Sequence, residues 1–407
     1  MSDPRPRRSF FARRVRILAA CALLVAADEP GTGDASLWVT VDTPADGETF
    51  VSGPPWAELR GWAGTQGIWG HDVVVIVDLS GSTANASGVD VDGDGEVGQG
   101  SRRKSVTRFV SSDPDDSVLA AELRAIRRLS DQVDRSRNRL GIVSFSGRPR
   151  TETSLGTTHD DLELALRNLE GAFAGGGTDL AAAIAHATRM LVQTSDGTER
   201  PRQRSLLILS DGEPTLPPPA STAGRAAIEA TTRAALEGIR THAFALHLPA
   251  EPDEDEASVY ARIAEVGGGS LVRVERPGEV IHELPEVRLG GVADVEVSNQ
   301  TTGEDARALR VFADGSFDAF VRLVQGANRV RVSALSDAGE RVDLVRTIRF
   351  EPREPRDADE AAEFERRRSA LLERLRARAA ETELARRASE HPEPAVRDLE
   401  LGVEPDE

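Results

Sequence analysis

The chain has 407 residues, a formal net charge of −18 and an isoelectric point near 5.0. This length exceeds what one ordinary hydrophobic core holds, so two or more domains are expected. The acidic balance argues against nucleic acid as the partner, because phosphate binding needs a basic face. With 39% hydrophobic and 29% charged residues, the composition is that of an ordinary soluble globular protein.

Residues 1–27 have the pattern of an export signal. Six arginines between Arg5 and Arg16 precede an apolar run over residues 17–27, which is too short for a stable membrane span. Arg7 and Arg8 resemble a twin-arginine signal, and Cys21 ends a stretch that resembles a lipobox, so a lipid anchor at Cys21 is an alternative. A mis-started N-terminus is the plainer alternative. We predict an exported protein, periplasmic, cell-surface or secreted, without a membrane span.

Residues 70–290 alternate between strand and helix patterns. Continuous apolar runs, typical of parallel strands buried on both faces, cover residues 72–78, 140–145, 205–209 and 242–248, with a weaker one at 270–274. Helical spacing is found at residues 117–133, 160–169, 179–192, 223–239 and 257–266. The alternation predicts a doubly wound, mostly parallel α/β sheet.

Both flanks of this region have the alternating pattern of half-buried strands. Residues 36–68 contain two such stretches, and residues 291–350 contain four more with turn residues between them. The turn that begins at Thr43 and the stretch from Asp314 to Asn328 resemble bacterial immunoglobulin-like domains. We predict one all-β sandwich into which the α/β domain is inserted, which chain termini lying close together would permit. Two unrelated β pieces are the plainer interpretation.

The C-terminal part is rich in Ala, Glu and Arg. Residues 351–390 are expected to form a charged, solvated helix, because only a thin apolar stripe containing Phe364, Leu371, Leu372 and Leu375 interrupts the charges. We expect residues 391–407 to be disordered.

A short polar motif follows the first buried strand. Asp78, Ser80 and Ser82 form a D-x-S-x-S pattern at the carboxyl end of this strand, where open α/β sheets bind ligands. One carboxylate and two hydroxyls on a tight loop suit a hard divalent cation, which prefers oxygen ligands. The motif alone is weak evidence, since serine-rich turns after strands are common.

This motif resembles the metal-ion-dependent adhesion site of the von Willebrand factor type A family. That site adds a threonine and an aspartate from later loops, and Thr178 in Gly-Gly-Gly-Thr-Asp and Asp211 in Ser-Asp-Gly-Glu-Pro match them in order. The resemblance covers roughly residues 70–285. It implies that Asp78, Ser80 and Ser82 coordinate Mg²⁺, Mn²⁺ or Ca²⁺ directly, Thr178 directly or through water, and Asp211 mainly through water. A degenerate site that keeps only the fold is the alternative.

Residues 83–116 form an acidic insertion between this motif and the first helix. Asp90, Asp92 and Asp94, with Gly95 and Glu96, match the first half of an EF-hand calcium loop. The acid expected at the twelfth position is absent, because Ser101 stands there, and Asp113, Asp115 or Asp116 would have to replace it. The insertion therefore predicts a Ca²⁺ loop, with a flexible acidic turn as the alternative.

These patterns together favour an exported, non-catalytic binding module. The family's ligands offer a carboxylate to the metal, so the resemblance implies a protein partner that presents an Asp or Glu. Catalysis is not expected, because the sequence offers no general base beside the aspartates and no typical catalytic zinc ligands. An envelope scaffold with a structural metal and an accessory of an ATPase remain the alternatives.

Overall fold

The computed structural model describes residues 37–65, 67–102, 109–172, 175–194, 200–247, 258–336 and 339–390. The predicted export signal, its Cys21 and the predicted disordered tail lie outside these residues. None of the helices in the described ranges is long and apolar enough to cross a membrane.

The α/β domain is built on a six-stranded sheet with the strand order β11-β10-β9-β4-β7-β8. All neighbouring strands are parallel except β8, which runs antiparallel to β7 at the edge. Every residue of β4 is buried, which explains its nearly continuous apolar sequence. The strands are β4 (Gly70–Asp78), β7 (Arg139–Phe145), β8 (Pro149–Thr153), β9 (Arg202–Ser210), β10 (Ile239–Leu246) and β11 (Gly268–Val274).

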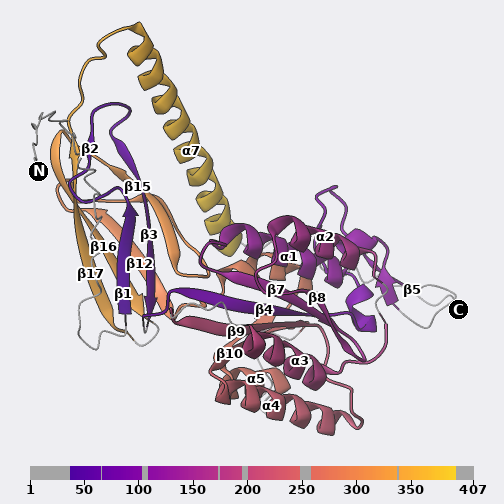
Figure 1. Ribbon diagram of the computed structural model, residues 1–407. Coiled ribbons are helices and arrows are strands. Elements are labelled where there is room, and N and C mark those ends of the chain that lie inside the picture. The colour runs from indigo at the N-terminus through magenta and orange to yellow at the C-terminus, as the bar shows by residue number, and fades with distance from the viewer. Residues whose placement is uncertain are drawn as a thin grey trace, which may run out of the picture. The chain divides into compact units, whose positions relative to one another are not determined.

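Helices cover both faces of this sheet, with α1 and α2 on one face and α3, α4 and α5 on the other (Figure 1). Successive residues of β4 point to opposite faces, so Val75 packs beneath α1 and Ile76 packs against α3 and α4. The helices are α1 (Val118–Gln132), α2 (His159–Glu170), α3 (Leu180–Gln193), α4 (Ala220–Leu236), α5 (Val259–Val266) and α6 (Val280–Glu283). Short 3₁₀ turns are η1 (Gly81–Ala84), η2 (Pro114–Asp116), η3 (Pro277–Glu279) and η4 (Leu284–Glu286).

Several element boundaries differ from the sequence-based prediction by one to three residues, and two of them lie on either side of Gly238. Helix α4 ends at Leu236 rather than at residue 239, because Gly238 adopts a positive φ of 73° that ends the helix. Strand β10 consequently begins at Ile239 and not at residue 242. The edge strand β8 and the hairpin of β5 (Gly100–Arg102) and β6 (Phe109–Ser111) were not predicted, because their sequences are polar and short.

The segments before and after the α/β domain pair with each other in two sheets. Leu59 of β3 lies opposite Ala319 of β15, and Phe350 of β17 pairs with Phe50 of β2. One hydrophobic core contains residues of both sheets. The four-stranded sheet has the order β1 (Leu37–Thr43), β3 (Trp56–Thr65), β15 (Ser316–Arg322) and β14 (Arg307–Val311). The five-stranded sheet has the order β13 (Glu304–Asp305), β12 (Val292–Asn299), β16 (Gly326–Ser336), β17 (Arg341–Phe350) and β2 (Thr49–Phe50).

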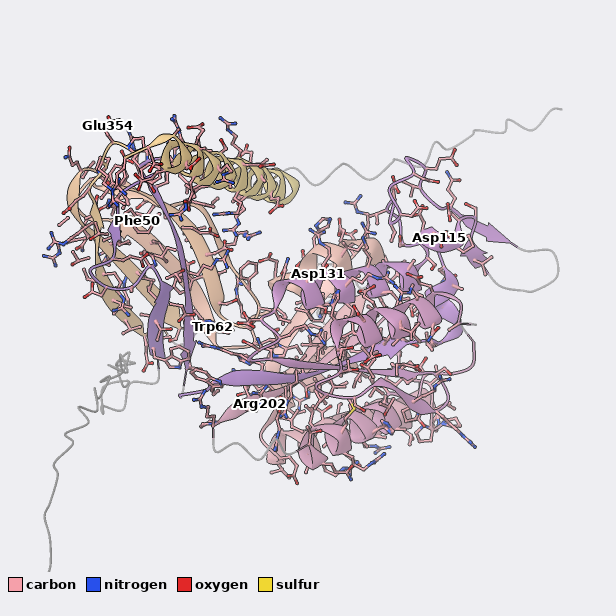
Figure 2. All side chains as sticks on the ribbon, turned by 45° about the horizontal axis from the view of Figure 1, so that its top comes forward. Phe50, Trp62, Asp115, Asp131, Arg202 and Glu354 are labelled. Carbon is pink, nitrogen blue, oxygen red and sulfur yellow. The ribbon has the colours of Figure 1, made fainter. Side chains whose placement is uncertain are left out.

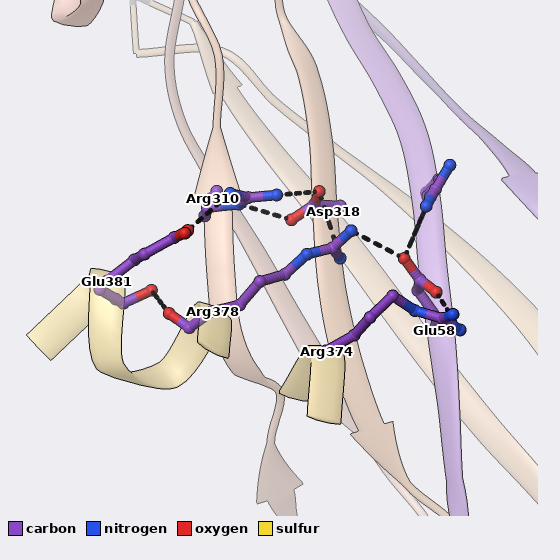
Figure 3. Close-up of polar contacts among 8 residues, drawn as sticks. Glu58, Arg310, Asp318, Arg374, Arg378 and Glu381 are labelled. Carbon is purple, nitrogen blue, oxygen red and sulfur yellow. Dashed lines mark hydrogen bonds and ion pairs between the residues drawn. The ribbon is translucent and has the colours of Figure 1, made fainter. Parts of the chain in front are cut away.

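Helix α7 (Ala358–Glu390) contacts the four-stranded sheet through a charged network (Figure 3). Arg378 forms ion pairs with Glu58 of β3 at 2.9 Å and Asp318 of β15 at 3.3 Å. Arg374 also pairs with Glu58, at 3.2 Å, and Glu381 pairs with Arg310 of β14 at 3.1 Å. One face of this charged helix is therefore held by ion pairs, and Leu375 of the thin apolar stripe is buried beside them.

Candidate metal centre

The loop that follows β4 carries the first three predicted ligands. Asp78 is the last residue of the strand and is fully buried. The backbone N–H of Ser80 donates to Asp78 Oδ1 at 2.6 Å, which turns the chain sharply into η1. This local hydrogen bond spans two residues, so the D-x-S pattern itself specifies the turn.

Hydroxyl groups connect Asp78 to Asp211, which follows the neighbouring strand β9. Ser82 Oγ donates to Asp211 Oδ1 at 2.7 Å and lies 3.0 Å from Ser80 Oγ. From the other side, Ser210 Oγ donates to Asp78 Oδ2 at 2.7 Å. Parallel pairing of β4 with β9 brings the two aspartates to the same sheet edge. Four of the five predicted ligands thus form one hydrogen-bonded cluster.

Thr178 lies in the loop before α3 and is almost fully buried. The N–H of Gly175 in this loop donates to the carbonyl of Leu79 at 2.8 Å, and the N–H of Thr178 donates to Thr215 Oγ1 at 2.8 Å. These contacts join the Thr178 loop to the loops after β4 and β9. In the described part of the chain, the hydrogen bonds that anchor Thr178 run through its backbone and not through its hydroxyl.

The two aspartates are electrostatically unfavourable as they stand. Burial raises the pKa of Asp78 to about 6; hydrogen bonds from Ser210 and Ser80 oppose this shift, and the charge of Asp211 adds to it. Burial also raises the pKa of Asp211, against the hydrogen bond from Ser82. Asp211 Oδ2 is buried without a hydrogen-bond partner. Two buried carboxylates, one orphaned oxygen and nearby hydroxyls fit a hard divalent cation.

Three residues of this region were missed by sequence reasoning. Ser210 bonds Asp78, and the Tyr260 hydroxyl lies 3.0 Å from Ser210 Oγ and donates to the carbonyl of Gly212, which fixes the Asp211 loop. Burial raises the pKa of Tyr260, so its hydroxyl stays protonated. Glu122 of α1 is fully buried. The sequence feature that indicates its burial is helical spacing, because Glu122 stands three residues after Leu119 on the apolar face of the helix.

The acidic insertion contains Asp115, which is labelled in Figure 2. It brings carboxylates together in two groups. The oxygens of Asp90, Asp92 and Asp116 lie within 4.8 Å of one another, and so do those of Asp92, Asp94 and Asp113. Neither group includes Glu96 or Asp115. Residues from the later η2 turn thus join the first half of the predicted loop.

Backbone amides already hold these carboxylates in place. Asp90 accepts from the N–H groups of Gly93 at 2.6 Å and Gly95 at 2.9 Å, and both glycines adopt positive φ. Asp116 is buried and accepts from Val91 at 2.6 Å and Gly98 at 2.7 Å. The loop is therefore folded around its acids rather than extended.

A family model described as von Willebrand factor type A domain matches residues 73–213. All five predicted ligands lie inside this match. No curated protein matches the chain.

Several solved structures resemble parts of the chain. The conserved hypothetical protein BatB from Bacteroides thetaiotaomicron is 22% identical, with a TM-score of 0.35, over 53% of this chain and 98% of that one. The pilus adhesin SpaC from Lactobacillus rhamnosus GG is 11% identical, with a TM-score of 0.38, over 72% of this chain and 46% of the adhesin. Proximal thread matrix protein 1 from the mussel byssus, with a zinc-occupied adhesion motif, is 13% identical, with a TM-score of 0.35. The match covers 53% of this chain and 46% of the mussel protein.

Proposed function

We propose that this chain is a non-catalytic binding protein that recognises a protein partner through a divalent cation. The cation, Mg²⁺, Mn²⁺ or Ca²⁺, would be held by Asp78, Ser80, Ser82, Thr178 and Asp211. The observation that carries the proposal is the pair of buried aspartates bridged by serine hydroxyls, with Asp211 Oδ2 left without a partner. When bound, the cation supplies a coordination position for an anionic oxygen of the partner.

The chain's own residues hold this site in position. Ser80 and Ser210 fix the two oxygens of Asp78, and Ser82 fixes one oxygen of Asp211. Tyr260 anchors the loop after β9 at the carbonyl of Gly212. The hydroxyls of Ser82 and Ser210 donate to carboxylates, which keeps these side chains fixed at the site.

The rest of the chain provides the setting of this site. We assign the two-sheet domain as an immunoglobulin-like frame that carries the inserted α/β domain, because β3 before the insertion pairs with β15 after it. The pattern of residues 1–27 supports export to the periplasm, cell surface or medium. A scaffold with a structural metal and an ATPase-associated protein are the alternative functions.

The acidic insertion is assigned a second cation, Ca²⁺. Support comes from the two groups of carboxylates that share Asp92 and from the buried Asp116, which takes the place of the missing twelfth ligand. The pKa of the exposed Asp92 is raised: the hydrogen bond from the Asp94 amide lowers it, but desolvation and the charges of neighbouring carboxylates together outweigh that bond. Ca²⁺ should protect this loop from protease, and the double variant Asp92→Asn, Asp94→Asn should lose that protection.

Calorimetry tests the principal site directly. The parent protein and the Asp78→Ala, Ser80→Ala variant are titrated with Mg²⁺ and with Mn²⁺. Both proteins also carry Asp92→Asn and Asp94→Asn, which remove carboxylates of the second proposed cation site. We expect one site in the parent and none in the variant. Equal binding to both proteins would remove the assignment of these residues.

Recognition of a carboxylate is tested by selecting displayed random peptides on the protein in Mg²⁺ and eluting with chelator. We expect enrichment of Asp and Glu, absent when the Asp78→Ala, Ser80→Ala variant is used. Peptides without acidic residues, or peptides that stay bound in chelator, would contradict metal-bridged recognition and favour the scaffold.

A further inference from the structure

The loop between α1 and β7 is joined to the two-sheet domain by a buried carboxylate. Asp314, in the turn between β14 and β15, directs its Oδ2 towards this loop. That oxygen accepts from the backbone N–H of Asp134 at 3.0 Å and from Asn138 Nδ2 at 2.6 Å. Because Asp314 is 2% exposed and Asn138 is 6% exposed, water has little access to replace these bonds. The carboxylate therefore contributes to holding the two domains together.

The turn that contains Asp314 fixes the orientation of its carboxylate. The other oxygen, Oδ1, accepts from the backbone N–H of Ser316 at 3.0 Å and from the Ser316 hydroxyl at 2.6 Å. Gly315 has a φ of +82°, and a Cβ added there would lie 2.1 Å from the carbonyl oxygen of Ala63 in β3. Glycine thus allows the turn to lie directly on β3. Asp314 is held by its own domain, and its second oxygen is left for the α/β domain.

Arg137, in the same loop as Asp134 and Asn138, makes a second contact with the two-sheet domain. Its guanidinium lies 4.1 Å from the ring centroid of Trp62 in β3 and 4.2 Å from that of Trp69, which follows β3. Such stacking is stabilising, and more so when the cation is partly desolvated, as the 15% exposed side chain of Arg137 is. Asp42 of β1 lies 3.9 Å from the same guanidinium.

The two points where the chain crosses between the domains are also tied together. Thr65, at the end of β3, donates through its hydroxyl to the carbonyl of Gly290, which precedes β12, at 2.9 Å. The N–H of Leu289 donates to the carbonyl of Ala313, beside Asp314, at 2.9 Å. Domains that share a small polar interface generally move relative to each other. Here, hydrogen bonds from the loop and from both crossing points oppose such motion.

We propose that Asp314 is a latch that locks the α/β domain to the two-sheet domain, so that the two move as one body. The latch does not require a bound cation, and it is independent of the proposed function. A binding site on a locked domain keeps one orientation relative to the rest of the chain. Less conformational freedom is then lost when a partner binds.

Pulsed dipolar EPR spectroscopy tests the latch by measuring the spread of distances between two spin labels, one in each domain. The labels are attached at Leu236→Cys on α4 and Val324→Cys after β15, two exposed positions, in a chain that also carries Cys21→Ser. Asn138→Asp replaces the Nδ2 donor with a carboxylate that repels Asp314. We expect this variant to broaden the distance distribution about 2-fold or more relative to the parent.

A rescue variant and a control separate the contact itself from other effects. Adding Asp314→Asn to Asn138→Asp exchanges the amide and the carboxylate, so a direct contact should restore a distribution close to that of the parent. Ser316→Ala is the matched control, because it removes a donor to the same carboxylate on the side of the two-sheet domain. It should leave the width unchanged. Circular dichroism checks that each variant is folded, and Asp314→Ala takes the place of Asn138→Asp if that variant does not fold.

Each other outcome counts against the latch. A parent distribution as broad as that of Asn138→Asp would show that the domains already move. An unchanged width in Asn138→Asp, or in Asp314→Ala if it has to be used, would overturn the proposal directly. If Asp314→Asn failed to narrow the distribution of Asn138→Asp, the loop and not its contact with Asp314 would be responsible, which would also overturn it. None of these measurements involves a cation, so their failure would leave the proposed function in place.

Discussion

Replacing Asp78 with asparagine tests whether the ionised form of Asp78 destabilises the fold when no cation is bound. Burial, with a contribution from Asp211, raises the pKa of Asp78 from 3.8 to about 6. Because this folded-state pKa lies above the unfolded value, the folded protein binds the proton more tightly. The resulting stability is present at low pH and is lost as the pH rises through about 6. A shift of this size corresponds to about 3 kcal/mol.

Asparagine mimics the protonated acid, so it should remove this pH dependence. In chelator, we expect the free energy of unfolding of Asp78→Asn, relative to the parent, to rise by about 2.5 kcal/mol between about pH 4 and pH 7.5, most of the full shift. Urea unfolding followed by circular dichroism measures it at each pH. Taking the difference between the two proteins cancels the contributions of other titrating groups to the free energy of unfolding. A difference that stays constant with pH would refute the reasoning.

A divalent cation should bring the stability of the parent close to that of Asp78→Asn. At a free Mg²⁺ concentration about 100 times its Kd, the parent gains about 2.7 kcal/mol of stability. Asp78→Asn should gain almost nothing, because a neutral amide is a poor replacement for a charged ligand. If Mg²⁺ stabilised both proteins equally, the cation would bind elsewhere.

Three further substitutions test how other parts of the fold are held. Asp72→Asn, which weakens contacts to Arg139 and Arg202, should destabilise the α/β domain by about 3 kcal/mol in urea unfolding, and an unchanged midpoint would contradict this. Asp116→Asn should speed amide exchange at Val91 and Gly98, since an NH₂ group would face one of these donors; unchanged exchange would show that the loop does not depend on Asp116. Arg378→Ala should reduce stability by about 1–2 kcal/mol and increase amide exchange along α7, whereas the exposed control Arg376→Ala should do neither.

The sequence alone determined the features that arise over a few residues. The apolar run of Val73–Val77 specified a strand buried on both faces, and the structure buries all of it. The turn at Asp78 and Ser80 followed from one local hydrogen bond. The order of strands and helices followed from their periodicities, with errors at ends such as Gly238, where the signal of one residue competes with that of its neighbours.

Only the tertiary structure decided which distant groups meet. The hydrogen bond from Ser210 to Asp78 joins residues far apart in sequence, and it depends on parallel pairing of β4 with β9. Arg378 could not be singled out among 50 basic residues, because its role depends on two acids presented by neighbouring strands. Glu122 had the right helical phase for the core, but what its charge faces is set by how α1 packs on β4. Local patterns specify conformation, whereas electrostatic partners are specified by packing over long sequence distances.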